Sequence, residues 1–181
     1  MSDIAAQPVR RSRSPIASIV GVLVPYALVA LVLRLVMARV FFLAGQDKID
    51  GLLLRIHVDF ANIGDVWMTL PQHIKETTFQ MFAAKYSALP IPTDVTAYLF
   101  TYAEFLLPVC LVIGFATRLS ALALLVMTVL MVVYATPETL WTTQAYWIAI
   151  LAVIVSIGPG ALSIDALLRY IATRDNPPAY R

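Results

Sequence analysis

The fold is decided by residues 96–135, which read TAYLFTYAEFLLPVCLVIGFATRLSALALLVMTVLMVVYA. A polar turn at Arg118 divides them into two apolar runs, Thr96–Ala116 with the single acid Glu104 and the uncharged Leu119–Ala135. A helix needs about 20 mainly apolar residues to cross about 30 Å of hydrocarbon. Because lipid offers the backbone no hydrogen-bond partners, both runs are predicted to be membrane-spanning helices.

Two further apolar stretches extend the pattern to four spans. One runs from Ile16 to about Gln46 and carries no charge as far as Leu33, and the other runs uncharged from about Thr143 to Gly158. The whole chain has 181 residues, of which 60% are apolar and only 13% charged, whereas about a quarter of a soluble domain is charged. The predicted fold class is an all-α membrane protein, a four-transmembrane-helix bundle in one domain.

The first stretch is long for a single crossing, and two arrangements fit it. It forms one long helix bent near Pro25, which is the arrangement we prefer, or Ile16–Pro25 lies along the surface before a shorter span from about Leu28. A cleaved signal peptide is disfavoured because the apolar run exceeds the usual length of about 7–15 residues.

The connection between the first two spans, residues 47–95, is too long to be structureless in a compact domain. After Pro71, apolar residues recur at helical spacing and predict an amphipathic helix that lies on the outer leaflet or caps the bundle. The stretch Ile49–Phe60 is a candidate for a second such helix. Beyond the fourth span, Gly158-Pro159-Gly160 stops the helix, and Ser163 is expected to cap a short C-terminal surface helix. In the amphipathic helix predicted between the first two spans, the positions that recur at helical spacing after Pro71 are Ile74, Thr78, Met81, Phe82, Tyr86 and Leu89.

These boundaries divide the chain into a basic tail (1–15), a membrane domain (16–168) and a second tail (169–181). Lysine and arginine near the ends of spans mark the cytoplasmic side. On the side of the two termini these cations are Arg10, Arg11, Arg13, Arg118, Arg169, Arg174 and Arg181. On the opposite side they are diluted by acids, so both termini are predicted to be cytoplasmic and residues 47–95 to lie outside.

Three ionisable residues fall within the predicted spans: Arg34, Arg39 and Glu104. Such groups are costly in a bilayer, so each is a candidate for function. A lone carboxylate there must protonate or find a cation, and the predicted partner of Glu104 is an arginine of the first span. The two arginines point about 140° apart around that helix, and depth favours Arg39. Three interpretations stay open: an interhelical structural pair, a ligand or proton site on the same pair, and snorkelling arginines with an unrelated acid.

The remaining polar residues suggest little chemistry. Lys48 follows the outer end of the first span, where it either complements the helix carbonyls or holds an anionic ligand. His57 and His73 lie outside the spans, so a haem with two axial histidines is unsupported. The single Cys110 excludes an internal disulfide and a CxxC pair. No metal site is expected, and the net charge of +2 argues against nucleic acid as a partner.

Four short motifs follow one another along the chain. They are Arg34-Leu35-Val36-Met37-Ala38-Arg39-Val40-Phe41-Phe42-Leu43-Ala44-Gly45-Gln46-Asp47-Lys48, then Ile91-Pro92, then Glu104 with Gly114-Phe115-Ala116-Thr117-Arg118, and finally Gly158-Pro159-Gly160-Ala161-Leu162-Ser163-Ile164-Asp165. In this order they resemble the DoxX family of small four-helix membrane proteins. The resemblance covers about Leu33–Leu168, although residues 49–89 form a longer connection than the family usually has.

The resemblance implies a bacterial inner-membrane protein that acts as a membrane subunit or anchor of an oxidoreductase assembly, either quinone-linked or tied to oxidative stress. It implies candidate site residues at Arg34, Lys48, Glu104 and Arg118, with no catalytic residue assigned. The expected partners are the lipid bilayer and a redox partner protein, quinone is the cofactor to test for, and the chain is not expected to be catalytic alone. The alternative is a non-enzymatic scaffold or a small-solute pathway, which would need a homodimer because four helices make a thin bundle.

Overall fold

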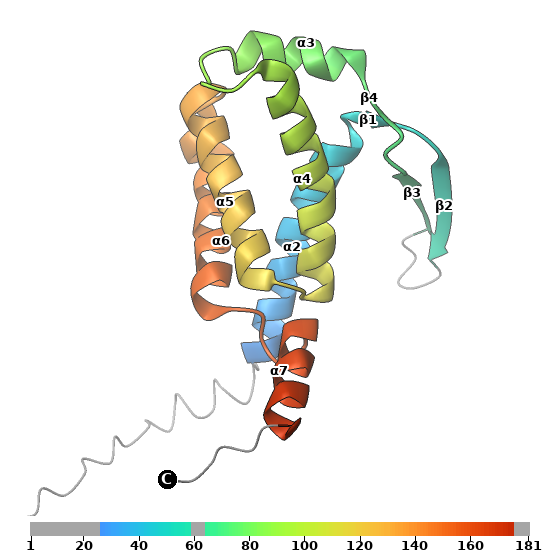
Figure 1. Ribbon diagram of the computed structural model, residues 1–181, viewed down its shortest axis with the longest axis vertical. Coiled ribbons are helices and arrows are strands. Elements are labelled where there is room, and N and C mark those ends of the chain that lie inside the picture. The colour runs from blue at the N-terminus through green and yellow to red at the C-terminus, as the bar shows by residue number, and fades with distance from the viewer. Residues whose placement is uncertain (1–25, 59–63, 176–181) are drawn as a thin grey trace, which may run out of the picture.

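The computed structural model describes residues 26–58 and 64–175 and contains four helices that are long and apolar enough to cross a membrane (Figure 1). These are α2 (Tyr26–Gln46), α4 (Thr93–Ile113), α5 (Thr117–Tyr134) and a fourth span made of the 3₁₀ turn η2 (Pro137–Thr139), the π turn η3 (Leu140–Gln144) and α6 (Ala145–Ile157). The predicted all-α, four-span membrane fold is confirmed.

The second, third and fourth spans begin at Thr93, Thr117 and Pro137, a few residues earlier than predicted. Pro92 stands just before α4, where its missing N–H costs the helix nothing. The turn from α4 to α5 is short because Gly114, with φ of 70°, and Ala116, with φ of 45°, both adopt the left-handed conformation. The tail 1–15 and the segment Ile16–Pro25 lie outside the described residues, so the choice between a long helix and a surface segment stays a prediction.

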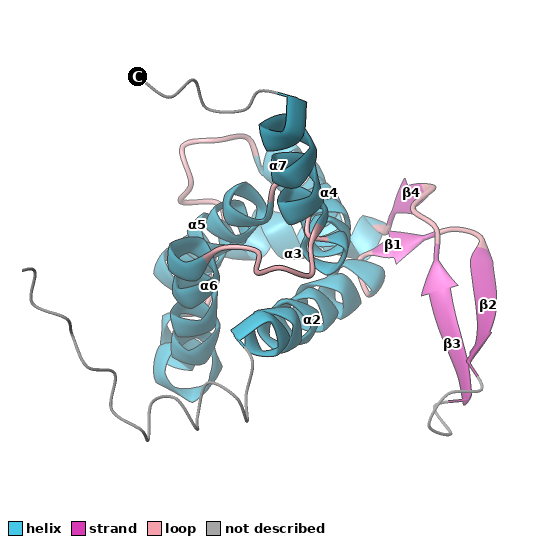
Figure 2. Ribbon diagram, turned by 90° about the horizontal axis from the view of Figure 1, so that it is seen from below, coloured by secondary structure: helices cyan, strands magenta, loops and turns pink. Residues whose placement is uncertain are grey.

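The four spans form a closed ring in which α2 packs against α4 and α6, and α5 packs between α4 and α6 (Figure 2). The buried face of α4 recurs at three- and four-residue spacing, as expected for a helix with one side in the core. Its members are Thr96, Ala97, Phe100, Thr101, Glu104, Pro108 and Leu111. Small residues at the helix contacts, such as Ala38 and Ala121, let the backbones approach closely, as membrane helices require.

The connection between α2 and α4 mixes strands with one helix. Strand β1 (Ile49–Asp50) pairs antiparallel with β4 (His73–Ile74), and α3 (Glu76–Lys85) lies across the end of the bundle (Figure 1). Two residues of α3, Thr78 and Phe82, are buried against the bundle. This agrees with the amphipathic helix predicted after Pro71.

A second amphipathic helix at Ile49–Phe60 was wrongly expected. Strand β2 (Leu53–Val58) instead pairs with β3 (Gly64–Thr69) in an antiparallel hairpin to one side of the helices (Figure 2). The side chain of Gln46, the last residue of α2, fixes this hairpin, since its Nε2 donates to the carbonyl of Thr69 (3.1 Å) and its Oε1 accepts from the N–H of Thr69 (2.6 Å). A strand pair satisfies its backbone groups across the ladder, which the local helical pattern does not reveal.

At the other end of the bundle, the chain leaves α6 at Gly158 and enters α7 (Ile164–Asp175). The hydroxyl oxygen of Ser163 accepts a hydrogen bond from the N–H of Ala166 (3.1 Å), which confirms the predicted cap. Both α7 and the start of α2 therefore lie at the same end of the bundle, opposite α3 (Figure 1).

Candidate functional site

Glu104 lies in the interior of the helix ring, about three turns from the start of α4, and is only 1% exposed. Helix α2 approaches it at Gly45, where an added Cβ would lie 3.2 Å from the backbone and Cβ of Glu104. Pro108, four residues further along α4, has no N–H for the carbonyl of Glu104. The two helices thus lie close together beside the point where α4 lacks one of its own hydrogen bonds.

The partner of Glu104 is Lys48, whose ammonium forms an ion pair with Oε2. The prediction that Arg34 or Arg39 neutralises this acid is therefore wrong. Lys48 follows the end of α2, and its side chain is 15% exposed. Its four-carbon stem carries the charge from beyond the helix end into the bundle, so a cation outside the span neutralises a carboxylate within it.

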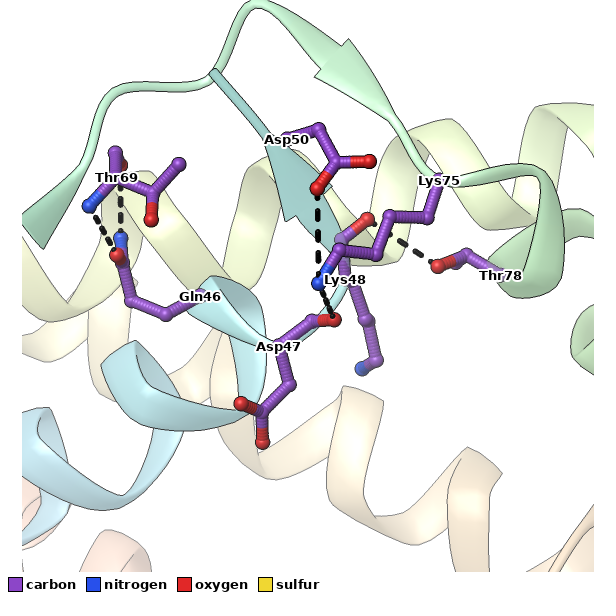
Figure 3. Close-up of polar contacts among 7 residues, drawn as sticks. All are labelled: Gln46, Asp47, Lys48, Asp50, Thr69, Lys75 and Thr78. Carbon is purple, nitrogen blue, oxygen red and sulfur yellow. Dashed lines mark hydrogen bonds and ion pairs between the residues drawn. The ribbon is translucent and has the colours of Figure 1, made fainter. Parts of the chain in front are cut away.

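The backbone of Lys48 is fixed by the start of α3 (Figure 3). Its carbonyl accepts hydrogen bonds from the N–H of Lys75 (3.1 Å) and from the hydroxyl of Thr78 (3.2 Å). The ammonium of Lys75 in turn donates to the carbonyl of Asp47 (2.9 Å). The capping helix and the buried ion pair are consequently joined through one residue.

A cluster of three aromatic rings adjoins the ion pair. The Lys48 ammonium is 5.8 Å from the centroid of the Phe82 ring, within the range of a cation–π contact. Phe82 stacks on Tyr86 with centroids 4.8 Å apart, and Phe100 meets both rings edge-on. Burial, and then the charge of Glu104, raise the pKa of Tyr86 to about 12. Tyr86 is therefore a neutral phenol at physiological pH.

Two buried polar atoms beside the pair have no hydrogen-bond partner within the described part of the chain. They are Oε1 of Glu104 and the hydroxyl of Thr101, which precedes Glu104 by about one turn on the same face of α4. An unpaired buried polar group costs about 1–3 kcal/mol. The two atoms therefore provide a free acceptor and a free hydroxyl for a polar ligand.

A groove of about 500 Å³ follows the seam between α2 and α4 away from the ion pair. Phe42 and Pro108 line it, about one turn beyond Gly45 and Glu104 on their respective helices. Arg39 is exposed and is the one charged residue in this apolar lining. Arg39 thus lies on the outer side of the seam and does not contact the acid.

Arg34 lies towards the opposite end of α2 and is fully buried. Its Nη2 donates to the carbonyl of Leu162 (2.5 Å), and Gly114 leaves room for the guanidinium because a Cβ there would collide with Nη1. Its Nε and Nη1 have no partner among the described residues. Arg34 therefore ties the chain between α6 and α7 to α2.

Arg118, the remaining predicted candidate, is exposed at the start of α5 beside Asp165 of α7. The two carboxylate oxygens of Asp165 accept hydrogen bonds from the N–H groups of Ala116 and Thr117, each at 2.8 Å. Desolvation alone would raise the pKa of Asp165, but these hydrogen bonds outweigh it and lower the pKa. Asp165 is thus an ionised cap on α5.

Of the five residues predicted as candidates, the structure brings together only Lys48 and Glu104. Thr101 and Tyr86 belong to the same centre and were missed. Thr101 could have been predicted from the sequence, because it lies three residues before Glu104 and therefore on the same face of the helix. Among the described residues, no group of three histidine, cysteine or acidic side chains could hold a metal ion.

The ring of spans and its buried ion pair define a multi-pass helical membrane protein with a polar centre inside the bundle. The family model of DoxX matches residues 29–137, which is more than half of the chain, and the chain belongs to the DoxX family. No curated protein and no solved structure matches it.

Proposed function

We propose that this DoxX protein is the membrane subunit of an oxidoreductase assembly and that its Lys48–Glu104 pair receives the head group of a quinone or quinol. The observation that carries the proposal is the free carboxylate oxygen of Glu104, which is buried and has no partner within the described residues. A quinol hydroxyl donates to such an oxygen, and a quinone carbonyl accepts from the Lys48 ammonium or the Thr101 hydroxyl.

The surroundings of the pair fit an amphipathic ligand of this kind. The rings of Phe82, Tyr86 and Phe100 give the planar head group aromatic contacts. The groove along the seam of α2 and α4 supplies apolar surface for an isoprenoid tail. Ligand sites of this type are mostly apolar, with a few polar groups that orient the ligand.

In the proposed assembly, this chain exchanges protons with the quinone, and a partner protein supplies the electrons. Proton exchange suits the pair, because a carboxylate and an ammonium side by side accept and return the protons that accompany quinone reduction. The electrons then come from a redox centre on a partner protein.

The proposed orientation places α7 in the cytoplasm and α3 outside a bacterial inner membrane. Arg118, Arg169 and Arg174 lie at the α7 end, whereas the lysines at the α3 end are interspersed with acids. The positive-inside rule assigns the cytoplasm to the first of these ends.

The test is quinone binding by protein purified in its native lipids and then reconstituted into nanodiscs. Wild-type protein is expected to retain quinone and to be labelled by a photoreactive quinone, and K48M and E104Q are expected to lose most of the labelling. The matched controls K85M and E76Q remove the same charges from exposed positions of α3 and should label as wild type does. Equal labelling of all five proteins, or none in the wild type, refutes the proposal.

One observation favours a second candidate, a non-enzymatic scaffold. Gly45 packs against the backbone of Glu104, so the ion pair also joins the end of α2 to α4 where the two helices lie close together. If the pair is purely structural, K48M and E104Q destabilise the protein without any accompanying change in ligand binding or partner crosslinking.

A further inference from the structure

A second site lies at the opposite end of the bundle, between the start of α5 and the start of α7. It is a pocket of about 470 Å³ whose lining includes Arg118, Arg169, Leu119 and Leu168. Two guanidinium groups from different helices thus share one pocket with two apolar side chains.

Asp165 also lines this pocket, but both of its carboxylate oxygens are engaged by the N–H groups of Ala116 and Thr117. The N-terminus of α5 is therefore already capped by Asp165, which also lines one side of the pocket. Arg169 also donates through its Nε to the carbonyl of Asp165 (3.2 Å). Among the described residues that line the pocket, one acid stands against two arginines, which leaves a net positive charge there.

Arg118 lines the pocket beside Gly158. An added Cβ on Gly158 would lie 2.9 Å from its Nε, so the glycine leaves space for the guanidinium, and its Nη2 makes a long contact of 3.4 Å with the carbonyl of Ser156. A guanidinium has five N–H donors in a planar fork that matches a phosphate group. Within the described part of the chain, the contact with Ser156 occupies one of these donors, which leaves most of them for a ligand.

The pocket also lies at the depth of lipid head groups. Leu119, in the first turn of the membrane-spanning helix α5, is 69% exposed, and beyond it Leu167, Leu168 and Ile171 of α7 are about half exposed. A span begins where the hydrocarbon ends, which is the level of the phosphates. A ligand with an anionic head and apolar chains satisfies both the arginines and these leucines.

We infer that this pocket binds the phosphate of an anionic phospholipid, with Arg118 and Arg169 on the head group and the acyl chains along Leu119 and Leu168. Basic pockets at the cytoplasmic ends of spans bind such lipids in general. The site shares no residue with the Lys48–Glu104 centre, so it stands independently of the proposed quinone site.

The experiment is native mass spectrometry of the full chain, delipidated in neutral detergent and titrated with cardiolipin, phosphatidylglycerol, phosphatidylcholine or inorganic phosphate. The wild type is expected to bind the two anionic lipids, and binding should weaken as salt rises. Phosphatidylcholine should bind much more weakly. Binding of inorganic phosphate as tight as that of the lipids would overturn the assignment to a lipid, as would equal binding of phosphatidylcholine.

The variants R118Q and R169Q are each expected to weaken cardiolipin binding about fivefold, and the double variant about 30-fold. R118K keeps the charge but loses the planar fork, so its cardiolipin binding should fall between that of wild type and that of R118Q. The control K85Q removes a cation at the other end and should have no effect. If R118K loses as much binding as R118Q, or if the double variant binds like wild type, the inference fails.

Discussion

Replacement of Lys48 by methionine measures what the buried ion pair contributes. Methionine keeps much of the stem but removes the ammonium, so the carboxylate of Glu104, only 1% exposed, is left without its partner and out of reach of water. Protonation of that carboxylate is then the least costly way for the folded protein to avoid an unpaired buried charge. For a group that titrates as glutamate does in water, this costs about 3.7 kcal/mol at pH 7.

Replacement of Glu104 by glutamine should lower the free energy of unfolding by less than K48M does. In E104Q the lysine loses its partner, but its side chain is 15% exposed and flexible, and its ammonium turns towards water. What remains is a buried amide in place of the acid, which costs about 1–2 kcal/mol. The double variant K48M/E104Q has no buried carboxylate to protonate, so its loss should be close to that of E104Q alone and smaller than the sum of the two single losses by up to about 3.7 kcal/mol.

The assay is reversible unfolding in mixed micelles of increasing SDS fraction, followed by tryptophan fluorescence, with K85M as the control. Since the K48M penalty is a protonation cost, it should fall by about 1.4 kcal/mol for each pH unit, to about 1 kcal/mol at pH 5. A K48M penalty that does not change between pH 7 and pH 5, or single losses that simply add in the double variant, would refute this reasoning.

Three further predictions follow from other contacts. G114A should destabilise the protein by at least about 1–3 kcal/mol in the same assay, because the new Cβ collides with the guanidinium of Arg34 in a left-handed backbone conformation; a wild-type unfolding curve would contradict this. D165N should lose about 0.5–2 kcal/mol near pH 7 by weakening the cap on α5. Because the pKa of Asp165 is lowered in the fold, the stability that its carboxylate contributes is present above the usual aspartate pKa and is lost as the pH falls through the folded pKa. The unfolding curves of wild type and D165N should therefore converge in acid. A difference between them that stays constant with pH would count against the cap. Finally, ultraviolet difference titration of wild type against Y86F should show one phenol that titrates near pH 12, and E104Q should lower that value; a titration near pH 10 in both backgrounds would argue against burial beside Glu104.

The spans were predictable because they depend on composition alone. About 20 apolar residues in a row have few alternatives to a membrane helix, and the cap at Ser163 depends on residues only three apart. The hairpin of β2 and β3 was not predictable in this way, since its backbone partners lie across a ladder. Local spacing therefore predicted the helices, with their starts displaced by a few residues, but not the strand pairing.

The partner of Glu104 was missed because only cations inside the spans were considered. The reach of Lys48 depends on where the chain turns after α2 and on the contacts of its carbonyl with Lys75 and Thr78, which are tertiary facts. Likewise, the place of Arg34 depends on a segment more than 100 residues later in the chain, which supplies the carbonyl of Leu162. The sequence thus identified which residues were costly to bury but not which of them meet.

The double attachment of Lys48 has a mechanical consequence. Its carbonyl is held by α3, and its ammonium is held by the carboxylate deep in the ring. A displacement of α3 would therefore act on Lys48 and on the β1–β4 pair that joins the same two segments. Through the ammonium of Lys48, movement at this end of the bundle is coupled to the charge balance at Glu104, near the middle of α4.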